Sequence, residues 1–91
     1  MDLLYEMEVE MSVEIVFMMD GRVPGVGIGV GEICTKKYPS FLEANLPNKG
    51  DKIHLQHGST IEQTSSWEVL SIQRFIRPEN ESYWVICKHL G

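Results

Sequence analysis

The sequence predicts a mainly β fold, a small five-stranded antiparallel barrel with one short helical insert. Three observations predict it: apolar and polar residues alternate early in the chain, β-branched and aromatic residues fill later segments, and turn-forming residues separate them. The chain has 91 residues, 43% hydrophobic and 23% charged, which is typical of one globular domain. We expect residues 11–91 to form this domain and residues 1–10 to form an acidic arm or a strand extension.

The first strand is predicted from the pattern of residues 5–19. Every odd position in this range is apolar, and the even positions begin with glutamates and a serine. Because successive strand side chains point to opposite faces of a sheet, one face should be apolar and the other acidic and wet. Apolar residues near the start also fit a helical stripe, so residues 2–10 are open to a helical arm as well as to a strand extension. Either Met1 or Met11 could initiate the chain.

A hairpin should follow the first strand, because Asp20-Gly21 is a dipeptide that favours tight turns between strands. The return strand is expected from about Arg22 to Thr35. Pro24 places its start at an edge or in an irregular stretch, since proline cannot donate to a sheet. Glycines alternate along this strand and would share one of its faces; they are Gly25, Gly27, Gly29 and Gly31.

This glycine-lined face has two interpretations. Bare backbone permits the tight packing of a bent strand, and it equally permits the close approach of a ligand or partner. Nucleotide-binding motifs do not fit, because the glycines alternate strictly and no Gly-Lys-Ser/Thr follows them. We therefore treat the four glycines as candidate ligand- or partner-binding residues.

Residues 38–46 are predicted to form a short helix or 3₁₀ turn. Pro39 suits the first turn of a helix, and Pro47 would end it. The apolar residues that fall on one side of such a helix are Phe41, Leu42 and Leu46. Residues 48–51 then form a cluster typical of a turn.

Three further strands are expected, over residues 52–57, 67–77 and 82–90. A small polar loop over residues 58–66 and a turn over residues 78–81 separate them. Five strands joined mainly by short turns favour a small barrel, since closure removes exposed edges. The arrangement is typical of an SH3-like barrel, with an OB-like barrel or a curled sheet crossed by a helix as the alternatives.

The run Leu46-Pro47-x-x-Gly50-Asp51-x-Ile53, followed by two amphipathic strands, resembles an arrangement found in many small prokaryotic and viral β-barrel proteins. The resemblance implies a barrel and no particular activity. It leaves a virus or phage as one candidate source of the chain.

The net charge of −5 resides in the first 20 residues, which carry six carboxylates and no Lys or Arg, whereas the remainder carries seven acidic and eight basic residues. An acidic chain repels phosphate backbones, which disfavours nonspecific nucleic-acid binding, and an acidic patch attracts a basic protein surface. Cys34 and Cys87 form no disulfide framework, and the start of the chain lacks the features of a signal peptide or a membrane span. We therefore expect a cytoplasmic protein.

The sequence contains no assembled catalytic or metal-binding motif. His54 and His57 would point to opposite faces of a strand, Cys87 and His89 would share one face, and no Cys-x-x-Cys is present. Serines and histidines occur without a nucleophile-elbow motif, and the N-terminal glutamates should lie on a solvated face. We therefore expect a protein that is not an enzyme and that holds no metal or cofactor.

Large aromatic residues mark a candidate contact surface. Tyr83 and Trp84 are adjacent in the last expected strand, so they point to opposite faces, and one should be exposed unless both faces are covered. Trp67 is a second candidate. Arg74 and Arg77 could pair with carboxylate or phosphate beside that surface.

Two functions follow from these residues. The first is a small non-enzymatic binding module, a regulator or inhibitor that acts on a protein partner, with a homodimer through the long first strand as an option. The alternative is a small-molecule or nucleotide binder, whose site at a subunit interface would combine the glycine backbone with Arg74 or Arg77. A single-strand nucleic-acid binder with Trp67 and Trp84 as stacking platforms fits the net charge poorly.

Overall fold

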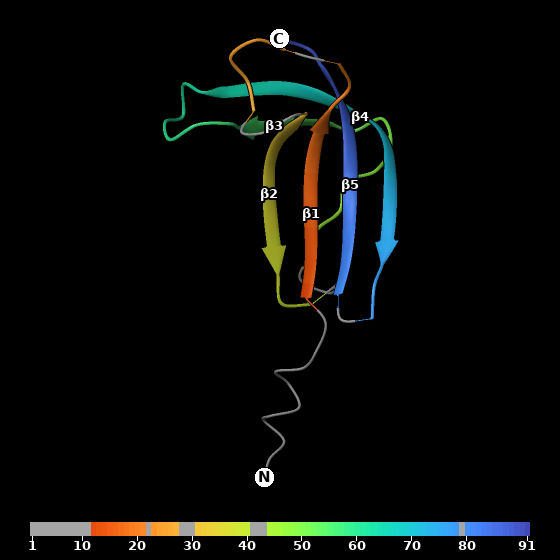
Figure 1. Cartoon of the computed structure of the whole chain (residues 1–91). Helices are drawn as coiled ribbons and strands as arrows, with labels where there is room; N and C mark the ends of the chain where they lie inside the picture. The colour runs from red at the N-terminus through yellow and green to blue at the C-terminus, as the bar shows by residue number, and fades with distance from the viewer. Residues whose placement is uncertain (1–11, 22, 28–30, 41–43, 79) are drawn as a thin grey trace.

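A computed structural model describes residues 12–21, 23–27, 31–40, 44–78 and 80–91. The described residues form five strands and no helix. The strands are β1 (Ser12–Met19), β2 (Glu32–Tyr38), β3 (Lys52–Gln56), β4 (Thr64–Ile76) and β5 (Asn80–His89). They make one sheet in the order β2-β1-β5-β4-β3, which curls until its two edge strands approach each other (Figure 1). The prediction of a mainly β fold is therefore confirmed, and the five strands form one nearly closed, barrel-shaped sheet.

β1 and β5 form the centre of the sheet, and they run parallel to each other. Ser12 pairs with Asn80 at one end of the two strands, and Met19 pairs with Cys87 at the other. The expectation of antiparallel pairing throughout is wrong for this pair, although the other three pairs are antiparallel. Parallel neighbours need a long crossover, and here the whole stretch from β2 to β4 provides it.

The connection between β1 and β2 spans residues 20–31, so the expected tight hairpin with a return strand from residue 22 is wrong. Gly21 and three of the four alternating glycines in this connection have positive φ angles: 95° at Gly21, 81° at Gly25, 104° at Gly27 and 81° at Gly31. These angles do not occur in a strand, and they favour glycine because it has no Cβ to clash. The three glycines therefore do not share a strand face, and Gly29 lies outside the described residues.

The helical insert expected over residues 38–46 is not seen. Its described residues belong to the end of β2, to a bend and to an irregular stretch, and residues 41–43 lie outside the described part. Ala44 and Leu46 pack against the core as the chain passes from β2 to β3. An irregular stretch that includes Ala44 and Leu46 therefore covers part of the core, whereas Phe41 and Leu42 lie outside the described residues.

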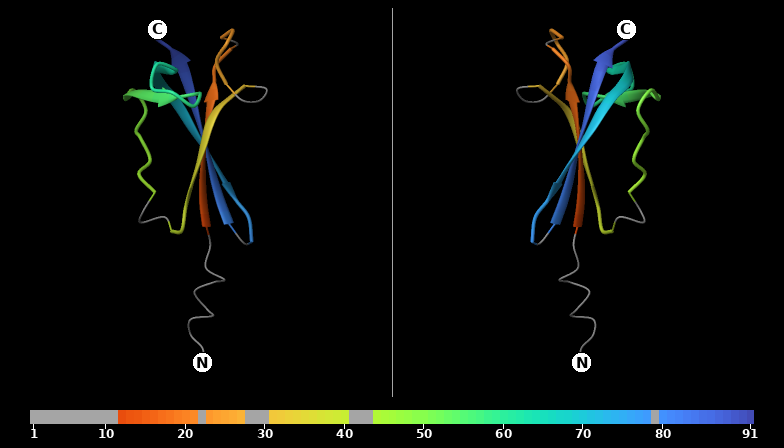
Figure 2. Two further views of the ribbon diagram at one scale, coloured as in Figure 1. Left: turned by 90° about the vertical axis from the view of Figure 1, so that its left-hand side faces the viewer. Right: turned by 90° about the vertical axis from the view of Figure 1, so that its right-hand side faces the viewer.

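β4 is bent, and the bend folds one end of the sheet over the rest. The register between β4 and β5 shifts between Val69 and Ser71, so one extra residue, Leu70, turns the strand. The first half of β4 and the whole of β3 swing across the sheet from this point (Figures 1 and 2). The turn before β3 is held to β4, because Gly50 N donates to Val69 O at 2.7 Å and Val69 N donates to Asp51 O at 2.9 Å.

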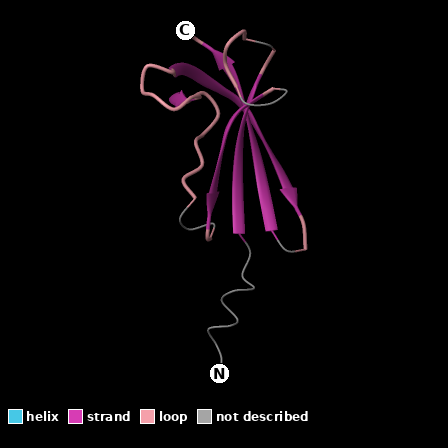
Figure 3. Ribbon diagram, turned by 60° about the vertical axis from the view of Figure 1, so that its left-hand side comes forward, coloured by secondary structure: helices cyan, strands magenta, loops and turns pink. Residues whose placement is uncertain are grey.

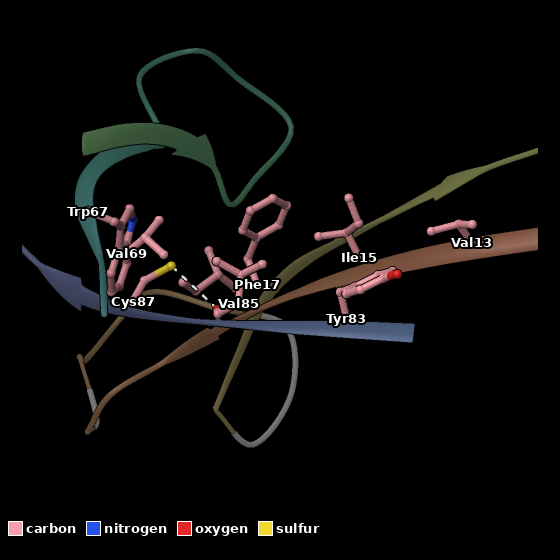
Figure 4. Close-up of a cluster of buried hydrophobic side chains, with 9 residues drawn as sticks. Val13, Ile15, Phe17, Trp67, Val69, Tyr83, Val85 and Cys87 are labelled. Carbon is pink, nitrogen blue, oxygen red and sulfur yellow. Dashed lines mark hydrogen bonds between the residues drawn. The ribbon is translucent and has the colours of Figure 1, made fainter. Parts of the chain in front are cut away.

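The core lies between the sheet centre and this folded arm (Figure 4). Odd-numbered residues of β1 point the same way as their neighbours on β5, because the register pairs Ile15 with Tyr83 and Phe17 with Val85. The buried apolar side chains among the described residues are Val13, Ile15, Phe17, Ile33, Trp67, Val69, Tyr83, Val85 and Cys87. The predicted apolar face of the first strand is therefore confirmed over β1, whereas residues 1–11, for which the sequence predicts an acidic arm or a strand extension, lie outside the described residues.

Candidate functional site

The face of the sheet opposite the core carries an aromatic pair. Trp84 points to this outer face and is 36% exposed, whereas its neighbour Tyr83 points into the core and is 5% exposed. The Trp84 ring lies 5.0 Å from the Phe75 ring at an interplanar angle of 56°, which is a favourable geometry for two aromatic rings. Val16 lies directly beside Trp84 in the sheet. The expectation that Tyr83 and Trp84 face opposite ways is confirmed.

We call this surface the outer patch. It consists of five apolar side chains from three neighbouring strands, all partly accessible to solvent: Val16, Met18, Phe75, Trp84 and Ile86. Exposed Gln73 lies opposite Trp84 at its border. The sequence signal for this surface is the change of even positions in the first strand from glutamate to valine and methionine.

Arg77 borders the outer patch. Its Nη1 donates to Ser82 Oγ at 2.7 Å, and its Cζ lies 6.0 Å from the centre of the Phe75 ring. A guanidinium at this distance from an aromatic ring is attracted by the ring's quadrupole. Of the candidate residues, the structure therefore brings Arg77 and Trp84 to one surface, with Phe75 between them.

Arg74 lies apart from this surface, in an ion pair. Its Nη2 is 3.1 Å from Glu81 Oε2, and the Tyr83 hydroxyl donates to Glu81 Oε1 at 2.8 Å. The hydrogen bond from Arg74, followed by that from Tyr83, holds the pKa of the Glu81 carboxyl below its ordinary value. This network ties β4 to β5, and it engages the guanidinium that the sequence suggested for ligand binding.

Trp67 is fully buried at 0% exposure, on the core side of the sheet. Its ring meets the His89 ring at 4.8 Å and 64°. Trp67 and Trp84 therefore lie on opposite sides of the sheet and do not form a shared stacking platform, which a single-strand nucleic-acid binder would need.

The glycine connection and the two arginines lie at opposite ends of the sheet. Gly31 O accepts a hydrogen bond from Met19 N at 2.6 Å, where β1 ends, and Arg77 N donates to Asn80 O at 2.9 Å, where β5 begins. Because β1 and β5 run parallel, the length of both strands separates these places. An anion site that combines the glycines with Arg74 or Arg77 would therefore need two copies of the chain.

An opening lies between the two edge strands, β2 and β3, which come close without pairing. Two hollows of about 370 and 330 Å³ occupy it, and Cys34 lines both. Apolar and basic side chains line the opening, among them Phe17, Ile33, Leu55, Lys36, His54 and His57. The sequence alone does not reveal this site, because only the order of strands in the sheet shows that β2 and β3 are its edges.

The two cysteines are protonated thiols in different surroundings. Cys34 is partly buried in the opening, and this burial raises the pKa of its thiol. Cys87 is fully buried, and burial, with a smaller effect from Cys34, raises its pKa to about 11. Since the thiolate is the reactive form, neither cysteine is prepared as a nucleophile.

The histidines of the opening are each hydrogen bonded to a serine of β4. His54 Nδ1 lies 3.0 Å from Ser66 Oγ, and His57 Nε2 lies 3.1 Å from Ser65 Oγ. A hydrolytic site also needs a group that orients the imidazole, and no carboxylate of the described residues is hydrogen bonded to either ring. These pairs instead link β3 to β4 and supply polar groups at the edge of the opening.

No protein-family model matches the chain, and no solved structure matches it significantly. Within the described part of the chain, no helix is long and apolar enough to cross a membrane. The protein has two candidate binding surfaces in its described part, the outer patch and the opening between β2 and β3.

Proposed function

We propose that the protein is a non-enzymatic binding module, a regulator or inhibitor that binds a protein partner through the outer patch. The observation that carries this proposal is Trp84, a large aromatic residue that is 36% exposed on a sheet face rather than packed in the core. Tryptophan and arginine are enriched among the residues that dominate binding energy at protein interfaces. Trp84 with Arg77 at the rim gives the outer patch both.

The chemistry of the outer patch supports a protein partner over a small ligand. Small-molecule sites are concave and enclose most of their ligand, whereas the outer patch lies on the broad face of a sheet. Full burial of one large apolar side chain contributes about 1.5–3 kcal/mol. A partner that covers Trp84 together with Phe75 and Val16 gains part of this amount from each, because all three are already partly buried. Contacts around the patch must add to this gain to offset the cost of association.

The net charge supports the same choice over nucleic acid. The chain carries −5 overall, so a phosphate backbone is repelled at long range. Arg77, the cation of the outer patch, already contacts Ser82 and the Phe75 ring. We retain an SH3-like or an OB-like barrel as proposals for the type of fold; the unpaired side between β2 and β3 supports the OB-like type, which is a partly open barrel.

The experiment that tests this function places a photo-crosslinking amino acid at Gln73, beside Trp84, and at Ile61, a control position that is 75% exposed on a distant loop. In cells that naturally contain the protein, we expect a protein adduct from position 73 and none of the same mass from position 61. The purified partner should then bind Trp84→Ser about thirtyfold more weakly than the wild type, and bind Ile61→Ser unchanged.

Equal affinity of the purified partner for Trp84→Ser and for the wild type would contradict the proposal. So would an adduct at position 73 that consists of nucleic acid or a small metabolite. The cellular adduct alone counts as support only when the purified partner repeats the difference between the two variants.

A further inference from the structure

The free edge of β2 is a backbone surface with unused hydrogen-bonding capacity. β2 borders the sheet and pairs with β1 on one side, and the described residues provide no strand partner on its other side (Figure 3). An exposed edge strand readily accepts an additional extended segment, which pairs with it through main-chain hydrogen bonds. The opening next to this edge therefore has the form of a site for one more strand.

The lining of the opening defines the side chains that such a strand should carry. Phe17, Ile33 and Leu55 offer apolar surface on the core side of the opening. The opposite face of the two edge strands carries exposed Lys37, which pairs with Glu14, and exposed His54, which pairs with Ser66. No Asp or Glu is among the described residues that line either hollow. The matching strand would present apolar residues to one side and carboxylates to the other.

The N-terminal segment of this same sequence, residues 2–11, has that composition. It contains four carboxylates and no Lys or Arg, and glutamate alternates with apolar residues from position 5 onward. Nine residues, Leu3 to Met11, would extend over about 30 Å as a strand, and the seven residues of β2 need about 23 Å. The segment is therefore long enough, and of suitable charge, to pair with the whole free edge.

We propose that residues 2–11 of a second copy of the chain add to the free edge of β2 as a sixth strand. The apolar side chains Tyr5, Met7 and Val9 then cover the hollows, and the glutamates between them lie on the outer face near Lys37 and His54. Each copy gives its segment and receives its partner's, so the assembly is a closed two-fold dimer. The site is incomplete within one copy, because its last strand comes from the other.

The segment should pair with a second copy of the chain rather than with its own β2, because no turn-forming residues directly precede β1. β1 lies one strand inward from the free edge of β2, since the order of strands is β2-β1-β5. To reach that edge in its own copy, the segment would have to reverse direction over the end of β2 just before Ser12. Such reversals depend on Gly, Pro, Asn, Asp or Ser, and none of these occurs from Leu3 to Met11. A segment without a turn is suited to extend into a neighbouring copy.

The test uses charge reversal in the full-length chain. Variant A carries Glu6→Lys, Glu8→Lys and Glu10→Lys in the segment, and variant B carries Lys37→Glu and His54→Glu on the outer face of the strands that border the opening. We expect the wild type to be a dimer by light scattering, and each variant alone to dissociate more than about tenfold more easily because like charges meet. A mixture of A and B should recover a dimer with one copy of each, because both of its segment–opening contacts again join opposite charges.

Matched controls carry the same kinds of charge change at exposed sites elsewhere. Asp20→Lys with Glu62→Lys is the control for variant A, and Lys49→Glu with Lys88→Glu is the control for variant B. Both control proteins should remain dimers. Trp84→Ser should remain a dimer as well, so failure of the outer patch and failure of this dimer are separate results.

A second readout is the alkylation rate of Cys34, a partly buried thiol of the opening, with fully buried Cys87 as an internal reference. Cys34 should react several times more slowly in the wild-type dimer than in variant A. This measurement also serves if variant B does not fold. A monomeric wild type, dimers that persist in both variants, or folded variants A and B that fail to join when mixed would each overturn the proposal.

Discussion

Tyr83 and Trp84 are consecutive residues of β5, yet Tyr83 is 5% exposed inside the core and Trp84 is 36% exposed on the outer patch. Successive side chains of a strand point to opposite faces of the sheet, so the Tyr83 ring packs in the core and the Trp84 ring forms part of the outer surface. Several measurements distinguish these contributions and the other structural features.

Truncation of the two rings should have unequal effects on stability. We expect Tyr83→Ala to lower the free energy of unfolding by about 3 kcal/mol or more, because it leaves a cavity between β1 and β4. Trp84→Ala should cost about 1 kcal/mol, mainly through loss of the contact with Phe75. Urea unfolding measures both values. Equal losses would show that the outer patch is a second core.

Two glycines of the connection between β1 and β2 should differ in their tolerance of alanine. At Gly27, where φ is 104°, a methyl group would lie 2.5 Å from the Glu32 carbonyl oxygen and 2.8 Å from Met19 Cε. At Gly25, where φ is 81°, nothing lies within 4 Å of that position. We expect Gly25→Ala to cost about 1 kcal/mol from backbone strain alone, and Gly27→Ala to cost at least about 2 kcal/mol. Thermal unfolding of the two variants checks the order, and a reversed order would contradict the packing of this connection.

Glu81 should make the free energy of unfolding depend on pH in the acidic range. Arg74 and Tyr83 lower the pKa of its carboxyl in the folded state from the ordinary 4.5. The stabilisation is therefore present above pH 4.5 and is lost as pH falls through the folded-state value. Glu81→Gln should flatten this part of the stability profile, measured by urea unfolding between pH 3 and pH 6. Glu62→Gln, in the exposed connection between β3 and β4, is the matched loss of one carboxylate, and an identical profile for both variants would refute the role of the Arg74 pair.

Cys87 should make the free energy of unfolding depend on pH in the alkaline range. Burial raises the pKa of its thiol from 9.0 to about 11 in the folded state, so only the unfolded chain ionises between these values. The contribution of Cys87 to stability should be constant below pH 9 and fall by roughly 2–3 kcal/mol as pH approaches 11. Cys87→Ala should remove most of this decline, whereas Cys34→Ala should leave the Cys87 contribution in place. An undiminished decline in Cys87→Ala would assign the effect to another group, such as Tyr83, whose pKa burial also raises.

Four of the five strands were predictable from the sequence, because local alternation and β-forming residues mark them. The exception is β2 (Glu32–Tyr38), which overlaps the return strand expected over residues 22–35 only at residues 32–35. Val13, Ile15 and Phe17 are buried in the alternating pattern that the sequence indicated. The opposite orientations of Tyr83 and Trp84 follow from the same rule. Trp67, by contrast, carries no local signal that distinguishes a core ring from a surface ring.

The arrangement of the strands was less predictable, because it depends on distant pairings. Asp20-Gly21 has the composition of a hairpin turn, yet the glycines after it adopt positive φ angles and extend the connection to Glu32. No local sequence pattern predicts that β5 lies parallel to β1, or that the extra residue Leu70 bends β4 across the core. The opening between β2 and β3 follows from those two features, so it could not be predicted either.

The parallel pairing of β1 with β5 joins the two most distant strands of the chain, with Ser12 next to Asn80. During synthesis, the first strand therefore leaves the ribosome long before its central neighbour exists. Chains dominated by such remote contacts fold slowly. A chain that stops before residue 80 lacks the middle of its sheet rather than its border, and β1 is left with an uncovered side as long as the strand itself.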